Sequence, residues 1–319
     1  MKISLLEPLR VPKEYIEELA KPLKELGHEF VYYENKTTDP NELYERSKDS
    51  EVIIIANNPY PKEVIDKLTT TKFIDVAFTG VDHVDNTSAK EKGIKIANAS
   101  GYATQAVAEL SIGLVLSVYR AINQGDKDIR QGEDFPGLIQ GQEIHGKTVG
   151  IVGTGTIGIH TAKLFKAFGA KVIGYNRSEK QEAIDAGIEY VSLDKLLEES
   201  DIISVHLPMT DDTKHTIGKN EIEKMKDSAI IINVARGPII DNDALAEALN
   251  AGTIAGAGID VFDMEPPIPN AYPLLHAKNA VLTPHVGFLT DEAMVLRAQI
   301  AFDNVLAYIN GEDKNIVSN

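Results

Sequence analysis

The chain has 319 residues, of which 43% are hydrophobic and 25% charged, as expected for a globular protein with two domains. Its 32 basic and 48 acidic residues give a formal charge of −16, which argues against nucleic acid as a partner. The sequence contains no cysteine, which excludes disulfides, thiolate nucleophiles and zinc–sulfur sites, and we predict no metal site. It has neither an apolar run of about eighteen residues nor a secretory hydrophobic region, so we expect a cytoplasmic protein without a membrane partner.

The first hundred residues alternate short apolar runs with amphipathic segments. In chain order the pattern predicts elements at 2–7 (strand), 12–26 (helix), 52–56 (strand), 61–68 (helix), 73–78 (strand) and 94–97 (strand). This alternation predicts an α/β domain, which lacks a glycine-rich phosphate loop. A long apolar helix is predicted from Thr104 to about Ala121. We interpret residues 123–142, rich in glycine and charge, as an extended connector or an arm that grips a second subunit.

A glycine-rich turn between two apolar strands is the most informative segment. The sequence G-T-G-T-I-G follows a strand at 147–152 and opens a helical pattern that Gly169 ends, and another strand follows at 171–175. In such a strand–turn–helix–strand unit the glycines let the backbone approach a pyrophosphate, and the helix N-terminus faces its negative charge. The segment therefore predicts dinucleotide contacts at Gly153, Gly155, Thr156, Ile157 and Gly158.

The remaining pattern sets the boundaries of two domains. Later strands are predicted at 202–205, 229–234, 255–260 and 280–282, followed by a helix at 290–309. Because this helix leaves the nucleotide domain, we expect it to pack on the first domain. The dinucleotide-binding domain is therefore predicted at residues 101–287, and the other domain at residues 1–100 plus 288–319.

The residues after the second strand of the glycine unit bear on the choice of dinucleotide. NAD sites usually carry Asp or Glu there, which binds the ribose hydroxyls. Here Asn176, Arg177 and Ser178 take that place, and the last two could bind a 2′-phosphate through charge-assisted hydrogen bonds. Arg177 could instead stack on adenine or point into water. The sequence therefore favours NADP(H), with NAD(H) as the alternative.

Three polar residues each follow a predicted strand of the nucleotide domain, where open α/β sheets gather their ligands. Arg236 lies in an N-x-x-R-G segment, Glu265 in D-V-F-x-x-E-P, and His285 in T-P-H. Taken singly, each has a structural alternative: a surface arginine, a solvated acid or a turn histidine with satisfied hydrogen bonds. Because the three motifs occur in a defined order along the chain, together they indicate a function more strongly than any one of them does alone.

The ordered motifs G-x-G-x-x-G, N-x-x-R-G, D-V-F-x-x-E-P and T-P-H resemble the D-isomer-specific 2-hydroxyacid dehydrogenase family, in particular its glyoxylate and hydroxypyruvate reductases. The resemblance covers nearly the whole chain, including segments 78–85 and 98–109. It implies two doubly wound parallel-sheet α/β domains, a Rossmann dinucleotide-binding domain and a flavodoxin-like substrate domain, in a homodimer. It also implies hydride transfer between NAD(P)H and a small 2-keto acid such as glyoxylate, hydroxypyruvate or pyruvate, which yields the D-2-hydroxy acid.

Reduction of a 2-keto acid needs a hydride at the carbonyl carbon and a proton at its oxygen. His285 is expected to donate the proton, because imidazoles gain and lose a proton near neutral pH. Glu265, hydrogen-bonded to the other ring nitrogen, would hold the ring and favour its protonated form. Arg236 would bind the substrate carboxylate and keto oxygen and stabilise the developing negative charge.

The resemblance implies further contacts with substrate and cofactor. The backbone N–H groups of Thr79 and Gly80 would complete the site for the substrate carboxylate. Contacts with the dinucleotide are implied for Thr104, His206, Pro208, Ala235 and Asp260. Among these, Asp260 is expected at the nicotinamide amide, whereas ordinary turn and packing roles are an equal alternative for His206 and Pro208.

The chain departs from the family pattern, and two other functions stay open. It lacks the ribose acid, it contains no tryptophan where many relatives carry one in the connector, and V-G-F-L replaces a glycine-rich turn after the histidine. One alternative is a dinucleotide-sensing binding protein, similar to the C-terminal binding corepressors that share this fold. The other is an enzyme similar to phosphite dehydrogenase. Turnover of keto acids separates the leading function from both.

Overall fold

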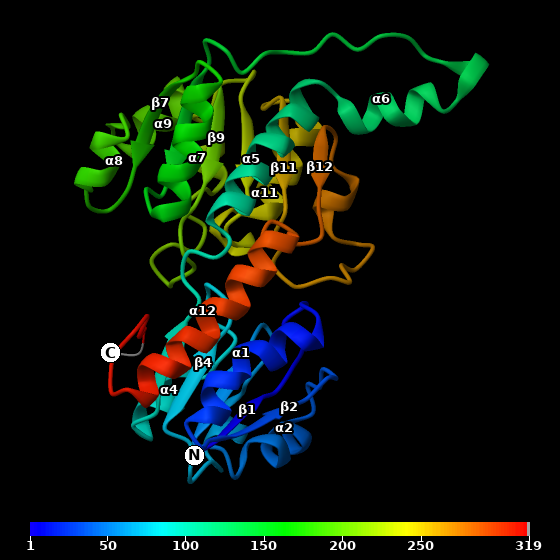
Figure 1. The fold of residues 1–319 in the computed structure, drawn as a ribbon. Coiled ribbons are helices and arrows are strands. Elements are labelled where there is room, and N and C mark those ends of the chain that lie inside the picture. Colours follow the sequence, from blue (N-terminus) through cyan, green and yellow to red (C-terminus); the bar gives the residue numbers. More distant parts are fainter. Residues whose placement is uncertain (318–319) are drawn as a thin grey trace. The chain divides into compact units, whose positions relative to one another are not determined.

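The computed structural model describes residues 1–317, and the chain divides into two compact units (Figure 1). One unit comprises Met1–Ala103 and Leu289–Asn319, and the other comprises Thr104–Phe288. Residues 318 and 319, the end of the predicted 288–319 segment, lie outside the described residues. Each unit has its own parallel sheet, of 5 and 7 strands respectively, which confirms the predicted α/β class.

The first unit is a five-stranded α/β layer structure. Its elements are β1 (Lys2–Leu5), α1 (Lys13–Glu25), β2 (Glu29–Tyr32), α2 (Pro40–Ser47), β3 (Val52–Ile55), α3 (Lys62–Ile65), β4 (Phe73–Val76), α4 (Asn86–Glu91), β5 (Lys95–Asn98) and α12 (Asp291–Ile309). The strand order β2-β1-β3-β4-β5 is the flavodoxin-like order. Strands β3 and β4 are buried throughout, as expected for a parallel sheet covered on both faces; β3 is entirely apolar, and β4 is apolar except for Asp75.

Helix α12 belongs to this first unit, as the sequence predicts. It packs beside α1 and against β4 (Figure 1). Its apolar residues Ala298, Ala301 and Phe302 enter the core. Its buried Asn304 donates hydrogen bonds to Asp75 Oδ1 on β4 at 2.8 Å and to the carbonyl oxygen of residue 98 on β5 at 3.0 Å. Burial raises the pKa of Asp75 well above its usual value, which favours the neutral acid beside this amide.

The second unit is a seven-stranded α/β layer structure. Its elements are α5 (Thr104–Tyr119), α6 (Ile122–Ile129), β6 (Thr148–Val152), α7 (Thr156–Ala167), β7 (Lys171–Tyr175), α8 (Gln181–Asp185), β8 (Glu189–Tyr190), α9 (Leu193–Glu199), β9 (Ile202–Val205), α10 (Lys219–Ile222), β10 (Ile230–Asn233), α11 (Asn242–Ala251), β11 (Gly256–Ile259) and β12 (Ala280–Leu282). The strand order is β12-β11-β10-β9-β6-β7-β8. Because the chain order reverses between β6 and β9, the carboxyl ends of these two strands form the switch point at which such sheets bind ligands.

The segment between α5 and β6 differs from its prediction. Residues 123–142 are predicted to form an extended connector or an arm, and α6 and a short 3-10 turn at Gly132–Asp134 occupy the first part of this segment, so that part is not extended. Side-chain hydrogen bonds four residues apart, from Gln124 to Asp128 and from Arg130 to Asp126, stabilise α6 locally. Figure 1 shows α6 and the residues after it projecting from the rest of their unit. We call residues 122–143 the arm.

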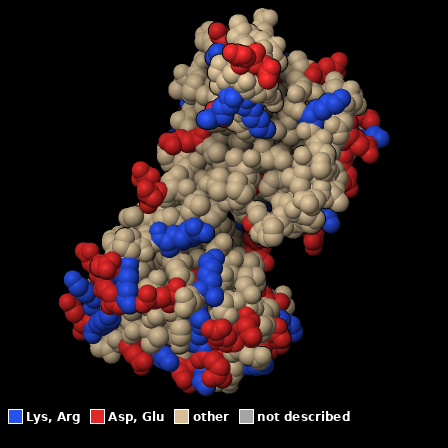
Figure 2. All heavy atoms as spheres, turned by 90° about the vertical axis from the view of Figure 1, so that its right-hand side faces the viewer, with Lys and Arg blue, Asp and Glu red and all other residues tan. Residues whose placement is uncertain are grey.

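The lengths of the helices and the charges on the surface can be compared with the expectation that the protein binds neither a membrane nor nucleic acid. Within the described part of the chain, no single helix is long and apolar enough to cross a membrane. Helices α5 and α6 pass this test only as a pair that is bent by 55°, and α5 packs on α7 and β11. On the face drawn in Figure 2, acidic and basic side chains are intermixed.

Candidate functional site

The three glycines of the predicted dinucleotide turn have three different structural roles. Gly153 has φ +102°, and a Cβ on it would lie 2.7 Å from the backbone carbon of His206. A Cβ on Gly158 would lie 2.1 Å from the carbonyl oxygen of Gly153, so only glycine lets α7 pack this close to the turn. A Cβ on Gly155 would meet nothing within 4 Å. The turn therefore packs tightly against the protein at two glycines and has open space at the third, where a pyrophosphate would approach.

Helix α7 starts directly after this turn. Gly155 is its N-cap, Thr156 and Ile157 form its first turn, and that turn carries no acidic side chain. A 12-residue helix with unsatisfied N–H groups at this end favours an anion there. Thr104 begins α5, which packs along α7. These residues fit a bound dinucleotide.

His206 faces the glycine turn from the end of β9, across the switch point. Its Nε2 lies 2.8 Å from the Ser204 hydroxyl, and burial lowers its pKa to about 3. The ring is therefore neutral at physiological pH. Pro208, two residues further on, is exposed, and its carbonyl oxygen accepts a hydrogen bond from Thr213 at 2.6 Å.

The residues predicted to select the dinucleotide follow β7. Asn176 is half-buried, and its Nδ2 donates to the backbone oxygen of Ser178 at 2.8 Å, whereas Arg177 and Ser178 are exposed. The segment 176–180 also contacts the Tyr190 hydroxyl, which accepts a hydrogen bond from the backbone N–H of Lys180 at 3.1 Å. The structure thus presents a guanidinium and a hydroxyl at this strand end, with no carboxylate at residues 176–178.

The turn after β10 presents Arg236. The buried Asn233 side chain builds this turn: its Oδ1 accepts from the N–H of Ala235 at 3.1 Å, and its Nδ2 donates to the carbonyl oxygen of Arg236 at 2.9 Å. A Cβ on Gly237 would lie 2.0 Å from the backbone of Phe262, so this glycine allows the turn to pack against the segment after β11. The N-x-x-R-G motif is thus explained by the turn that it forms.

Glu265 and His285 come into direct contact, although they lie 20 residues apart. His285 Nδ1 is 2.8 Å from one carboxylate oxygen of Glu265 and 3.0 Å from the other. The imidazole also packs edge-on against Phe288, with ring centroids 5.6 Å apart. The His285 side chain is 18% exposed and that of Glu265 is 74% exposed. Because solvent screens this carboxylate, its main effect is to orient the ring and to assign the proton on Nδ1, which leaves Nε2 for a ligand.

Asp260 holds the turn that carries His285. Its Oδ1 accepts hydrogen bonds from the Thr283 hydroxyl at 2.6 Å and from the Val286 N–H at 2.9 Å, and its Oδ2 accepts from the Gly287 N–H at 2.8 Å. Its own carbonyl oxygen accepts from the His285 N–H at 2.8 Å. His285 has φ +55°, a left-handed conformation that costs free energy outside glycine. The Asp260 contacts stabilise that conformation.

Asp260 is only 1% exposed, and burial raises its pKa while these hydrogen bonds oppose the rise. The sequence motifs imply only a cofactor contact for Asp260, and this structural role is not predicted from them. A signal was present, since Asp260 and the T-P-H segment lie in neighbouring motifs at the ends of adjacent strands. The contact of Asp260 with a nicotinamide stays a prediction.

The residues predicted to bind the substrate carboxylate belong to the first unit. Thr79 and Gly80 follow β4 and are half-buried, and the Thr79 carbonyl oxygen accepts a hydrogen bond from Asn98 Nδ2 at 2.7 Å. In the neighbouring turn, the buried Glu7 carboxylate accepts hydrogen bonds from the backbone N–H groups of residues 56 and 58. The strand-end turns of this sheet are therefore fixed by buried side chains.

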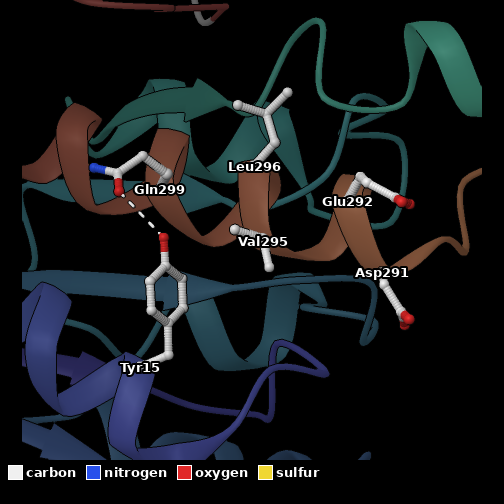
Figure 3. Close-up of a pocket in the computed structure, with 6 residues that line it drawn as sticks. All are labelled: Tyr15, Asp291, Glu292, Val295, Leu296 and Gln299. Atoms are coloured by element: carbon white, nitrogen blue, oxygen red, sulfur yellow. Dashed lines mark hydrogen bonds between the residues drawn. The ribbon is translucent and has the colours of Figure 1, made fainter.

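A surface groove of the first unit contains none of the predicted site residues. It is lined by Tyr15 on α1 and by α12 residues, with Val295 and Leu296 as its apolar part (Figure 3). The Tyr15 hydroxyl donates to Gln299 Oε1 at 3.3 Å across it. The groove thus separates neighbouring helices and is distinct from the strand-end turns.

We predict that Asp260→Asn destabilises the second unit. An amide offers one acceptor oxygen where the carboxylate accepts three hydrogen bonds, so a buried N–H of Val286 or Gly287 would lose its partner at a cost of about 1–3 kcal/mol. Thermal unfolding should show a fall in Tm, by about 2–4 °C per kcal/mol for a unit of this size. The exposed Asp212→Asn serves as the control, and equal Tm values for both variants would contradict the role of Asp260.

The sequence and the structure of this chain are both similar to those of known proteins from one family. A sequence model described as "D-isomer specific 2-hydroxyacid dehydrogenase, NAD binding domain" matches residues 112–287. A glyoxylate reductase of Thermofilum pendens is 40% identical over 88% of this chain and 86% of its own, and a hydroxypyruvate reductase of Blautia hydrogenotrophica is 36% identical over 93% and 94%. The crystal structure of a glyoxylate reductase from Paecilomyes thermophila superposes with a TM-score of 0.89 at 30% identity, over 99% of this chain and 98% of that one. The chain therefore belongs to the D-isomer-specific 2-hydroxyacid dehydrogenase family.

Proposed function

We propose that this protein reduces a small 2-keto acid, such as glyoxylate, hydroxypyruvate or pyruvate, to the D-2-hydroxy acid. The observation that carries the proposal is the hydrogen-bonded pair of His285 Nδ1 and Glu265, in the same unit as a glycine turn that fits a dinucleotide. Reductases of glyoxylate and hydroxypyruvate among the relatives support this substrate class. They also favour an enzyme over a dinucleotide-sensing binding protein.

The bound nicotinamide dinucleotide supplies the hydride. His285 would supply the proton: Nδ1 is held by Glu265, so Nε2–H would be the group that protonates the keto oxygen, which becomes the hydroxyl oxygen of the product. The imidazole then regains a proton from solvent. Its left-handed backbone and the edge contact with Phe288 limit the positions that the ring can adopt. Limited motion keeps the donor oriented before substrate arrives, which lowers the entropic cost of the reaction.

Arg236 and two backbone groups bind the substrate's negative charge in this proposal. The guanidinium would hold the carboxylate and the keto oxygen, which fixes the carbonyl carbon and stabilises charge as it develops on oxygen. The rigid turn built by Asn233 supports this role, because a mobile arginine would orient substrate poorly. The N–H groups of Thr79 and Gly80 would complete the carboxylate site. Ala235 and Asp260 would contact the cofactor.

We assign NADPH as the preferred cofactor over NADH. Arg177 and Ser178 are exposed after β7. Residues 176–178 include no carboxylate, so no negative side chain at these positions repels a 2′-phosphate. NADH would retain every other contact of the turn at Gly153, Gly155 and Gly158. We also propose a cytoplasmic location, which a chain without cysteine fits.

A homodimer built through the arm is the proposed assembly. The arm exposes several large apolar side chains, which is unusual for a segment surrounded by water. Ile129 is 66% exposed, Leu138 96% and Ile139 52%. Such side chains favour burial against a second copy of the chain. The two-fold arrangement would let each arm contact the partner in the same way.

Replacing His285 tests the proton donor. His285→Asn should lower kcat with glyoxylate by about 10²–10⁴, because the amide cannot deliver a proton, while cofactor affinity stays within about twofold. Asparagine tolerates a left-handed backbone, so the turn should persist. His215→Asn is the matched control, since His215 is another histidine of this unit with positive φ. Equal losses of turnover and cofactor affinity would mean that the imidazole supports the fold.

Replacing Arg177 tests the cofactor preference. Arg177→Ala should raise the KM for NADPH by about 10–100-fold, the value of a charge-assisted hydrogen bond, and leave the KM for NADH unchanged. Steady-state oxidation of both cofactors with the same keto acid gives this comparison within one preparation. A wild-type preference for NADH would overturn the assignment. Phosphite oxidation without keto-acid turnover would instead support the phosphite-dehydrogenase alternative.

Charges in the arm test the assembly. The double variant Ile129→Asp/Leu138→Asp should have the mass of one chain in sedimentation equilibrium, where the wild type has the mass of two. Leu26→Asp is the control, because Leu26 is 55% exposed in the first unit. A dimeric arm variant would show that another surface makes the dimer.

A further inference from the structure

The hydroxyl of Tyr190 connects two segments of the proposed dinucleotide site. On one side it lies 2.5 Å from the Thr154 hydroxyl, within the glycine turn. On the other side it accepts a hydrogen bond from the backbone N–H of Lys180 at 3.1 Å. Tyr190 lies on β8, a two-residue strand that pairs with β7. One side chain of an edge strand thus joins the turn after β6 to the segment after β7.

Thr154 gives this connection a fixed end. It is fully buried, and it lies between Gly153, whose backbone packs on His206, and Gly155, the N-cap of α7. Its methyl group packs over β7, where a Cβ on Gly174 would lie 3.2 Å from Thr154 Cγ2. Thr154 therefore moves only if the glycine turn itself moves.

The other end of the connection is an exposed segment. Residues 177–180 are exposed, and the contacts that restrain them include the hydrogen bond from Asn176 Nδ2 to the Ser178 carbonyl oxygen and the one from Lys180 to Tyr190. The first bond lies within the segment and fixes its internal shape. The second ties the segment to β8, in addition to its covalent connections to β7 and α8, and so restrains where Arg177 and Ser178 are presented.

We propose that Tyr190 and Thr154 are positioning residues that hold segment 176–180 at the distance at which it binds the 2′-phosphate of NADPH. The proposal rests on the NADPH preference inferred above. The pyrophosphate would lie on the glycine turn and the 2′-phosphate on the segment after β7, so both phosphate groups belong to one ligand of fixed dimensions. A bond between the two segments reduces the entropic cost of ordering them when both phosphate groups bind at once.

Deleting the hydroxyl tests this role. Tyr190→Phe keeps the ring on β8 and removes both hydrogen bonds, and Thr154→Val keeps the shape of Thr154 without its hydroxyl. Each variant should raise the Kd for NADPH and for adenosine 2′,5′-bisphosphate by about 3–10-fold, the range of one net hydrogen bond. The Kd for NADH and for 5′-AMP should not change, nor should kcat at saturating NADPH. The double variant should bind NADPH as tightly as either single variant, because each single variant already removes the hydrogen bond between Thr154 and Tyr190.

The control is Tyr119→Phe, which removes a buried hydroxyl of the same unit that donates to the carbonyl oxygen of Asp201 at 3.3 Å, before the start of β9. It should leave all four dissociation constants unchanged. Tyr190→Phe with equal losses for NADPH and NADH, or with a lower Tm and unchanged binding, would overturn the positioning role. If wild-type protein prefers NADPH and Tyr190→Phe binds it normally, only this role fails. If wild-type protein binds NADH better, the NADPH preference and the positioning role fail together.

Discussion

The buried carboxylate of Asp260 is the interaction on which the proposed chemistry depends. It follows β11, and it accepts hydrogen bonds from residues after β12, so it joins two adjacent strands at their carboxyl ends. Together with the backbone hydrogen bond from the His285 N–H to the Asp260 carbonyl oxygen, those three hydrogen bonds stabilise the left-handed conformation of His285. With its backbone in this conformation, the imidazole lies against Glu265. A buried charge thus stabilises a strained residue in the proposed active site.

The same logic operates in the glycine turn and in the Arg236 turn. Gly153 and Gly237 each allow a backbone approach that a Cβ would prevent, against residues 206 and 262 respectively. In both cases the approach joins turns that follow neighbouring strands of one parallel sheet. The sheet brings the strand ends together, and the glycines let the turns between them pack closely. Side chains that are far apart in the sequence thereby lie at one edge of one unit.

The sequence was sufficient for the features that depend on periodicity and on motif order. It predicted most of the parallel strands of the two sheets, the helix that begins after the glycine turn, and the pairing of His285 with Glu265. It missed short elements such as β2 and β8, because two to four residues carry little periodic signal. It also missed α6, since glycine and charge in residues 123–142 suggested an extended chain while side-chain pairs four residues apart stabilise a helix. The contacts of Tyr190 depend on three-dimensional neighbours that no local pattern encodes, whereas for Asp260 the adjacent motifs carry an indirect signal.

The charge of the chain sets a constraint that the proposed site must overcome. A formal charge of −16 repels both an anionic keto acid and a dinucleotide phosphate at long range. That repulsion is screened beyond about 8–10 Å at physiological salt, so binding depends on groups within direct reach. The N-terminus of α7 supplies partial positive charge at the glycine turn, and Arg236 and Arg177 supply full charges after β10 and β7. The three are separate positive groups on one acidic unit, which favours ligands whose negative groups have the matching spacing and disfavours anions in general.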